Sequence, residues 1–110
     1  MTTRTVPTQK DTLDFVRVHW PKHVHVQARV NKLVEECGEV MGAWVKMGDG
    51  TGRKSITDLA QETAQLVICA MALAEAAGFD LENEIADEWE RANVRVWPGQ
   101  EGEGVSGDRD

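Results

Sequence analysis

The chemically informative residues of this chain are acidic side chains set at helical spacing inside two apolar segments. The first segment, KLVEECGEV, contains Glu35, Glu36 and Glu39, and the second, DLAQETAQLV, contains Glu62 three residues before Gln65. Carboxylates in apolar segments are costly to bury unless a cation meets them. Neighbouring carboxylates also repel one another, and a hard divalent cation with oxygen ligands relieves this repulsion. The pattern therefore predicts a Mg²⁺ site, with Mn²⁺ as the alternative metal.

The spacing of apolar residues predicts an all-α fold. A short first helix is expected to begin near Asp11, whose carboxylate can cap it, and to end at Pro21. The second helix is expected from about His25 to Met47. Its core-facing stripe consists of residues at three- and four-residue steps, namely Val26, Val30, Leu33, Cys37, Val40, Met41 and Trp44.

Two further helices are predicted after the glycine-rich break GDGTGR. The third is expected to open at a capping box formed by Ser55 and Asp58 and to close at Gly78. Its residues 66–74 are apolar around nearly the whole circumference, so we expect a homodimer or homotetramer with this helix at the interface. Asp80 is expected to cap the fourth helix, whose apolar residues are Leu81, Ile85, Trp89 and Ala92.

The two acidic segments are expected to meet in the fold. On a helical wheel, Glu36 and Glu62 fall at the margins of their apolar stripes. Glu39 and Gln65 lie about 60° further out, and Glu35 points more nearly to the opposite face. A short connection favours antiparallel packing of the two helices through these stripes. Glu36, Glu39, Glu62 and Gln65 then converge along one edge of the seam, the acidic edge.

Length and composition predict one cytoplasmic domain. The 110 residues, 41% of them apolar, suffice for one modest core, expected over residues 11–97 between a flexible leader, 1–10, and a disordered acidic tail, 98–110. A formal net charge of −7 disfavours binding to duplex nucleic acid. No segment has the length and apolarity of a signal core or membrane span, so no membrane partner is expected. Cys37 and Cys69 stand alone, which is typical of reduced, packed thiols.

Three strings of the sequence resemble one enzyme family. KLVEECGEV, DLAQETAQLVICAMALAEAAGFDLENEI and ERANVR are together similar to the MazG-like all-α nucleoside triphosphate pyrophosphohydrolases over about residues 26–95. The pattern of that family is ExxE followed by ExxD. The resemblance implies a four-helix bundle whose acidic residues bind magnesium. It also implies an enzyme that splits a nucleoside triphosphate between its α- and β-phosphates, giving a monophosphate and pyrophosphate.

The positions that match the family motifs define the implied metal site. Glu36 and Glu39 match ExxE, and Glu62 matches the first residue of ExxD, whereas Gln65 stands where the family has Asp. An amide oxygen can coordinate magnesium but brings no charge, so the metal should be held more weakly. Asp58, one turn before Glu62, is a candidate to supply the missing charge directly or through water.

Other residues are predicted to serve the water and the substrate. Glu35 or Glu39 is expected to orient or deprotonate the attacking water. The substrate-binding candidates are the cations Lys32, Lys54, Arg91 and Arg95, the amide of Asn93 and the indole of Trp20. The resemblance assigns Asn93 and Arg95 to phosphate or ribose. Lys32 has an alternative role, because it can simply pair with Glu36 one turn on.

Three classes of function remain open from the sequence. The first is a metal-dependent pyrophosphohydrolase for a ribo- or deoxyribonucleoside triphosphate, with the phosphoribosyl-ATP pyrophosphohydrolases as a narrower alternative. The second is a nucleotide-binding or regulatory protein with a weakened site, which predicts stabilisation by the ligand without turnover. The third is a structural oligomer with a solvated acidic edge, which predicts no effect of metal or nucleotide.

Overall fold

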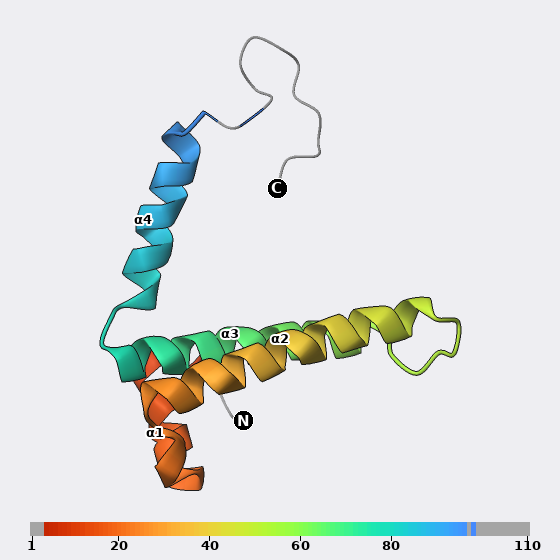
Figure 1. Cartoon of the computed structure of the whole chain (residues 1–110), viewed down its shortest axis with the longest axis horizontal. Helices are drawn as coiled ribbons and strands as arrows, with labels where there is room; N and C mark the ends of the chain where they lie inside the picture. The colour runs from red at the N-terminus through yellow and green to blue at the C-terminus, as the bar shows by residue number, and fades with distance from the viewer. Residues whose placement is uncertain (1–3, 97, 99–110) are drawn as a thin grey trace.

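The computed structural model describes residues 4–96 and 98, and in this part of the chain all regular structure is helical (Figure 1). The elements are α1 (Gln9–His19), the 3₁₀ turn η1 (Pro21–His23), α2 (Val26–Gly48), α3 (Ile56–Ala77) and α4 (Leu81–Val94). The all-α class predicted from the sequence is confirmed. The predicted acidic tail lies outside the described residues, apart from Pro98.

The start of α1 differs from the prediction. Thr8 is the N-cap residue, because its hydroxyl accepts a hydrogen bond from the backbone N–H of Asp11 at 3.1 Å. The carboxylate of Asp11 in turn accepts from the backbone N–H of Thr8 at 2.9 Å. Asp11 is therefore the third residue of a capping box and not the cap itself. Residues 8–10, which the sequence assigned to the leader, are the cap and first turn of α1.

The other helix ends agree with the predictions to within about a residue. His25 caps α2, and η1 begins at the predicted break, Pro21. The backbone N–H of Ser55 donates to the carboxylate of Asp58 at 2.8 Å, so these two residues open α3 as expected. At the other end of α3, Gly78 adopts a left-handed conformation. The glycine-rich break between α2 and α3 is also present.

Gly78 has a φ of 86°, a backbone conformation in which a Cβ atom is strained. We expect Gly78→Ala to lower the free energy of unfolding by about 1 kcal/mol. The control is Gly42→Ala in the interior of α2, where an added Cβ would meet nothing within 4 Å and alanine favours the helix. Urea unfolding of both variants measures the difference. Equal stability of the two variants would contradict a left-handed cap at residue 78.

Helix α3 is the central element of the fold. α2 packs along it in a long antiparallel hairpin, and α1 packs against its C-terminal half (Figure 1). Leu13 and Val16 of α1 form a buried cluster with Ala72 of α3. Ala43 of α2 and Cys69 of α3 are also buried. The small side chains at these contacts let the helices approach closely, but they make a small core.

The contact of α2 with α3 corrects the core-facing stripe predicted for α2. The buried residues of α2 include Arg29 and Glu36. Cys37, Met41 and Trp44, which were predicted for the core, are exposed in this chain. The apolar residues of α2 spread over a wider part of its circumference than one neighbouring helix can cover. We call this part the apolar arc of α2, and α3 lies against one margin of it. Charged residues at that margin are therefore drawn into the seam, while much of the arc stays uncovered.

Helix α4 extends away from the hairpin, so the described chain has the shape of an L (Figure 1). The radius of gyration of the chain is 17.8 Å, whereas about 13 Å is typical of a compact domain of this length. Among the described helices, none is long and apolar enough on its own to cross a membrane. α3 and α4 meet the length and composition criteria only as a pair bent by 107°.

Candidate functional site

The four residues of the acidic edge differ in how far they are buried. Glu36 on α2 is only 8% exposed, and Glu62 on α3 is half-buried. Glu39 and Gln65 are exposed. The helical wheel predicts this order, because residues at the stripe margins face the neighbouring helix and residues further out face solvent. Each helix of the hairpin thus contributes one inner carboxylate and one outer oxygen-bearing side chain.

The donor set of the acidic edge suits magnesium, but its side chains are not gathered around one point. Within residues 4–96 and 98, no three His, Cys, Asp or Glu side chains form a group that could hold a metal ion. All four candidate ligands are carboxylate or amide oxygens, which Mg²⁺ and Mn²⁺ prefer. The side chains of Glu39 and Gln65 are exposed, so they can turn toward the seam without disturbing the packing. The magnesium site stays a prediction.

Lys32 lies beside the buried carboxylate of the acidic edge. Its Nζ is 3.4 Å from Oε2 of Glu36 and 2.6 Å from Oε1 of Glu35. The pairing of Lys32 with Glu36, one turn on, is therefore present. The hydrogen bond to Glu35 raises the pKa of Lys32, so the amine carries its charge at neutral pH. A cation is thus fixed next to carboxylates that would otherwise repel an anionic substrate.

Arg29 is a residue of the seam that the sequence reasoning missed. It is 6% exposed, and its Nε donates a hydrogen bond to the carbonyl oxygen of His23 at 2.9 Å. Burial raises the pKa of the Cys69 thiol, and the charge of Glu36 raises it further, while Arg29 and Lys32 oppose this shift. These charged groups therefore surround one stretch of the seam. Its position could have been inferred from the spacing: Arg29 lies seven residues, or about two helical turns, before Glu36, so the two residues share one face of α2.

Two of the predicted carboxylates have other partners. The hydrogen bond from Lys32 lowers the pKa of Glu35, which makes this exposed carboxylate a weaker proton acceptor at neutral pH. The carboxylate of Asp58 accepts hydrogen bonds from the backbone N–H and the hydroxyl of Ser55, and these bonds lower its pKa. Asp58 is the N3 residue of the capping box that opens α3, so any contribution to a metal would compete with these hydrogen bonds.

The predicted substrate residues of α4 lie away from the acidic edge in this chain, because α4 projects from the end of the hairpin (Figure 1). Arg91 pairs with Glu88 at 2.6 Å, one turn earlier on α4. The amide Nδ2 of Asn93 donates to the carbonyl oxygen of Trp89 at 3.0 Å. Arg95 is the C-cap residue of α4. A single chain does not bring these groups to Glu36 and its neighbours.

The last two substrate candidates lie at opposite ends of the hairpin. Trp20 is the exposed residue that ends α1, and its ring lies 6.0 Å from that of Phe15 and 5.6 Å from that of His19. This aromatic group can stack on a nucleobase, but no described contact joins it to the acidic edge. Lys54 is half-buried in the connection just before α3. Its charge acts on Asp58, whose pKa it helps to lower.

The predicted acidic edge therefore consists of the buried carboxylate of Glu36, the half-buried carboxylate of Glu62 and two exposed side chains with oxygen ligands, and Lys32 pairs with Glu36. Such a set is suited to holding a divalent cation with a phosphate group. The sequence matches no protein-family model, and no curated protein matches it.

Proposed function

We propose that this protein is a MazG-like nucleoside triphosphate pyrophosphohydrolase that depends on Mg²⁺ or Mn²⁺. The observation that carries the proposal is Glu36, a nearly buried carboxylate on a helix–helix seam. An apolar side chain would stabilise such a position better, because burying a carboxylate is costly. The Lys32 amine at 3.4 Å offsets part of this cost, and a role in binding a divalent cation would give the buried carboxylate a function. The ExxE string at Glu36 and Glu39, followed by Glu62 and Gln65 on the facing helix, supports the same conclusion.

Each residue of the acidic edge has a part in the proposed hydrolysis. Glu36 and Glu62 would hold the divalent ion, with Glu39 and Gln65 as further ligands. When bound, such an ion neutralises phosphate charge and lowers the pKa of a water molecule. Lys32, which pairs with Glu35 and Glu36, would contact a phosphate oxygen.

The chemical step is the displacement of pyrophosphate by water. The water oxygen forms a bond to the α-phosphorus, the bond between this phosphorus and the bridging oxygen breaks, and pyrophosphate leaves with that oxygen. The proton of the water passes to a carboxylate. Of the two candidates we assign this role to Glu39, because the carboxylate of Glu35 is occupied by a hydrogen bond from Lys32.

The proposal includes a MazG-like bundle completed by further copies of the chain. The described part of one chain supplies a two-helix seam with α1 across one end, and its core is small. Four helices around one core would bury the apolar arc of α2 and the nearly all-apolar segment of α3. A dimer is the smallest assembly that provides them.

A second candidate function follows from Gln65. With an amide in place of a carboxylate, the edge carries three charges and should bind its metal more weakly. A protein with such a site can bind a nucleotide without turning it over at a useful rate. The two candidates differ in turnover, and they share nucleotide binding.

The test is a panel of ribo- and deoxyribonucleoside triphosphates incubated with the full chain. We expect equal amounts of pyrophosphate and nucleoside monophosphate from at least one of them with Mg²⁺ or Mn²⁺, and neither product when EDTA replaces the metal. Release of orthophosphate with a diphosphate would contradict cleavage at the α-phosphorus. Metal-dependent thermal stabilisation by a nucleotide without any products would favour the second candidate, and the absence of both effects would refute both.

A further inference from the structure

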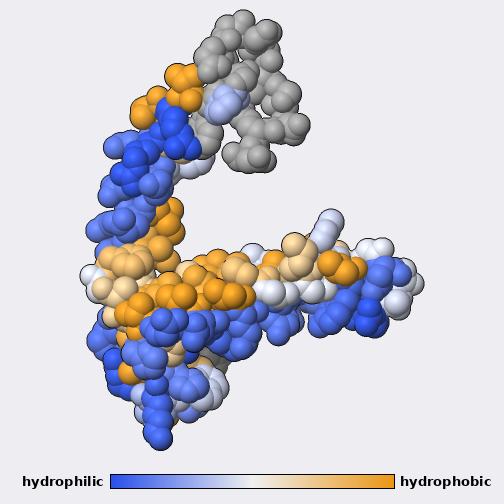
Figure 2. All heavy atoms as spheres, in the orientation of Figure 1, coloured by the Kyte–Doolittle hydropathy of each residue, from blue (hydrophilic) through white to orange (hydrophobic). Residues whose placement is uncertain are grey.

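Two apolar faces have no partner among residues 4–96 and 98. The hairpin face is formed by Val34, Met41 and Val45 on α2 with Ile56 and Val67 on α3, and the arm face by Ile85 and Trp89 on α4. Each of these side chains is between 53% and 68% exposed. Figure 2 shows the apolar residues gathered along one side of the hairpin and the hydrophilic ones along the other.

The two faces are joined at the corner of the L. A groove there is lined by Val67 and Met71 of α3 and by Leu81 and Ile85 of α4. The same groove is also lined by Gln9 and Lys10 of α1 and by the acidic residues Glu75, Asp80 and Glu82, so the apolar residues of the two helices meet there among polar ones. One partner can therefore contact both the hairpin face and the arm face.

Gln9 fixes the angle at this corner. Its Nε2 donates hydrogen bonds to the carbonyl oxygen of Phe79 at 2.6 Å and to Oε1 of Glu75 at 3.1 Å. Its Oε1 accepts from the backbone N–H of Leu81, the first residue of α4, at 2.9 Å. One side chain of α1 thus ties the end of α3 to the start of α4. The helices are held 107° apart, so the arm face cannot fold back along its own hairpin.

We propose that α4 is an arm that docks on the hairpin face of a second copy, while the arm of that copy docks on the first. Gln9 is the positioning residue that presents the arm. This proposal rests on the homo-oligomer described above and specifies which surfaces pair. We choose a second copy as the partner because each copy carries one arm face and one hairpin face. In a two-fold dimer, each arm face covers the hairpin face of the other copy, so all four apolar faces are buried.

The exposed area agrees with a dimer of this kind. The seven side chains of the two faces offer on the order of 100 Å² each, with the indole of Trp89 above that value. Together they give roughly 700 Å² per copy, close to the ~800 Å² per partner of a standard stable interface.

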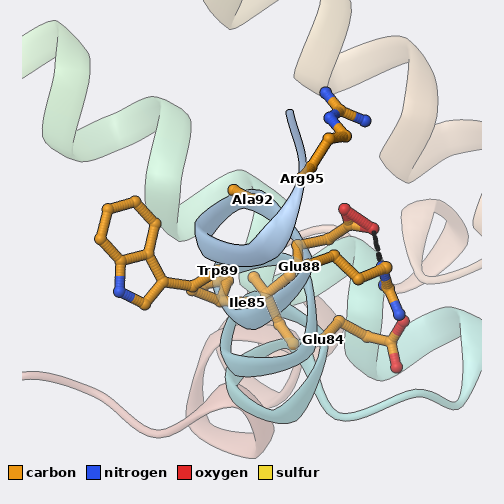
Figure 3. Close-up of a pocket in the computed structure, with 8 residues that line it drawn as sticks. Glu84, Ile85, Glu88, Trp89, Ala92 and Arg95 are labelled. Carbon is orange, nitrogen blue, oxygen red and sulfur yellow. Dashed lines mark hydrogen bonds and ion pairs between the residues drawn. The ribbon is translucent and has the colours of Figure 1, made fainter. Parts of the chain in front are cut away.

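The arm separates its apolar and charged sides as docking requires. Figure 3 shows Trp89 directed away from the side of α4 that carries Glu84 and Glu88. On that charged side, Glu88 is engaged by Arg91 through hydrogen bonds at 2.6 and 2.9 Å. The charged groups can therefore stay in solvent when the indole is covered.

Light scattering coupled to size-exclusion chromatography tests the proposal on the full chain. We expect a mass of twice 12.2 kDa for the wild type. Trp89→Asp on the arm and Val67→Asp on the hairpin should each give a monomer with unchanged helical circular dichroism. The control Glu90→Gln, an exposed position elsewhere on α4, should remain dimeric. A monomeric wild type at all concentrations would refute the exchange, whatever the outcome of the pyrophosphate assay.

Mixing the two monomeric variants distinguishes reciprocal exchange from other dimers. In a mixed pair, the intact arm of Val67→Asp meets the intact hairpin face of Trp89→Asp, so a dimer should reappear with one of its two contacts. A dimer built from α4 against α4 predicts no loss in Val67→Asp, and one built from hairpin against hairpin predicts no loss in Trp89→Asp. Either result would overturn the proposal.

Gln9→Ala tests the clamp. The variant should keep its helices but weaken dimerisation about tenfold, because the free arm samples many directions before it docks. Arg17→Ala is the control, since Arg17 is an exposed residue of the same helix that pairs with Asp14. Unchanged dimerisation of Gln9→Ala would show that Gln9 does not position the arm.

Discussion

Glu36→Gln is expected to lower the rate of metal-dependent pyrophosphate release by roughly 100-fold or more. The amide has nearly the shape of the carboxylate, so the seam keeps its packing. The negative charge that holds the divalent ion is lost, and Lys32 keeps Glu35 as its partner at 2.6 Å. The melting temperature should change by only a few degrees, because the substitution removes a buried charge without leaving a cavity.

The control for Glu36→Gln is Asp14→Asn. Asp14 also pairs with a lysine one turn away, at 2.7 Å, but it lies on α1, outside the acidic edge. The Asp14→Asn variant should keep the wild-type rate of pyrophosphate release. Steady-state assays over a range of Mg²⁺ concentrations separate weaker metal binding from slower chemistry. If Glu36→Gln retains the wild-type rate at every Mg²⁺ concentration, the buried carboxylate has no role in catalysis and the proposed site is wrong.

The helices were predictable from the sequence because their ends depend on local chemistry. Ser55 and Asp58 form their capping box within one turn, and Gly78 takes the left-handed conformation that glycine tolerates best. The start of α1 was misplaced because Thr8 and Asp11 are both capable of capping a helix. The structure shows that they act together, one at each end of a capping box.

The faces of the helices were less predictable, because they depend on which neighbour each helix finds. The apolar arc of α2 contains more residues than α3 covers, and nothing local decides which margin is buried. Cys37 and Trp44 therefore stay exposed, while Arg29 and Glu36 enter the seam. Glu36 is more buried than Glu39, and Glu62 more than Gln65, although the buried side of α2 is not centred on the predicted stripe. Arg29 was missed, since a long charged side chain usually lies at the surface.

Contacts between distant parts of the chain lay beyond sequence patterns. The bonds of Gln9 to Glu75 and Leu81 span 66 and 72 residues. No helical periodicity links such positions, and a lone glutamine in a first helical turn carries no signal. The angle at which α4 leaves the hairpin was therefore not foreseen, although its cap, Asp80, and its apolar residues were.

Gln65→Asp is expected to lower the Mg²⁺ concentration at half-maximal rate by about tenfold. The added carboxylate lies three residues after Glu62, so without metal the two charges repel and the variant should melt at a lower temperature than the wild type. With Mg²⁺ this order should reverse, because a ligand that binds only the folded chain stabilises it in proportion to its affinity.

The matched control for Gln65→Asp is Gln61→Asp, which adds the same charge one turn earlier on the exposed side of α3. This variant should show the loss of stability without the gain in metal affinity. Melting curves and pyrophosphate assays at increasing Mg²⁺ concentrations measure both effects. A response of Gln65→Asp equal to that of Gln61→Asp would mean that residue 65 is outside the metal site. A tighter and faster Gln65→Asp would instead identify the amide as the feature that limits the natural protein.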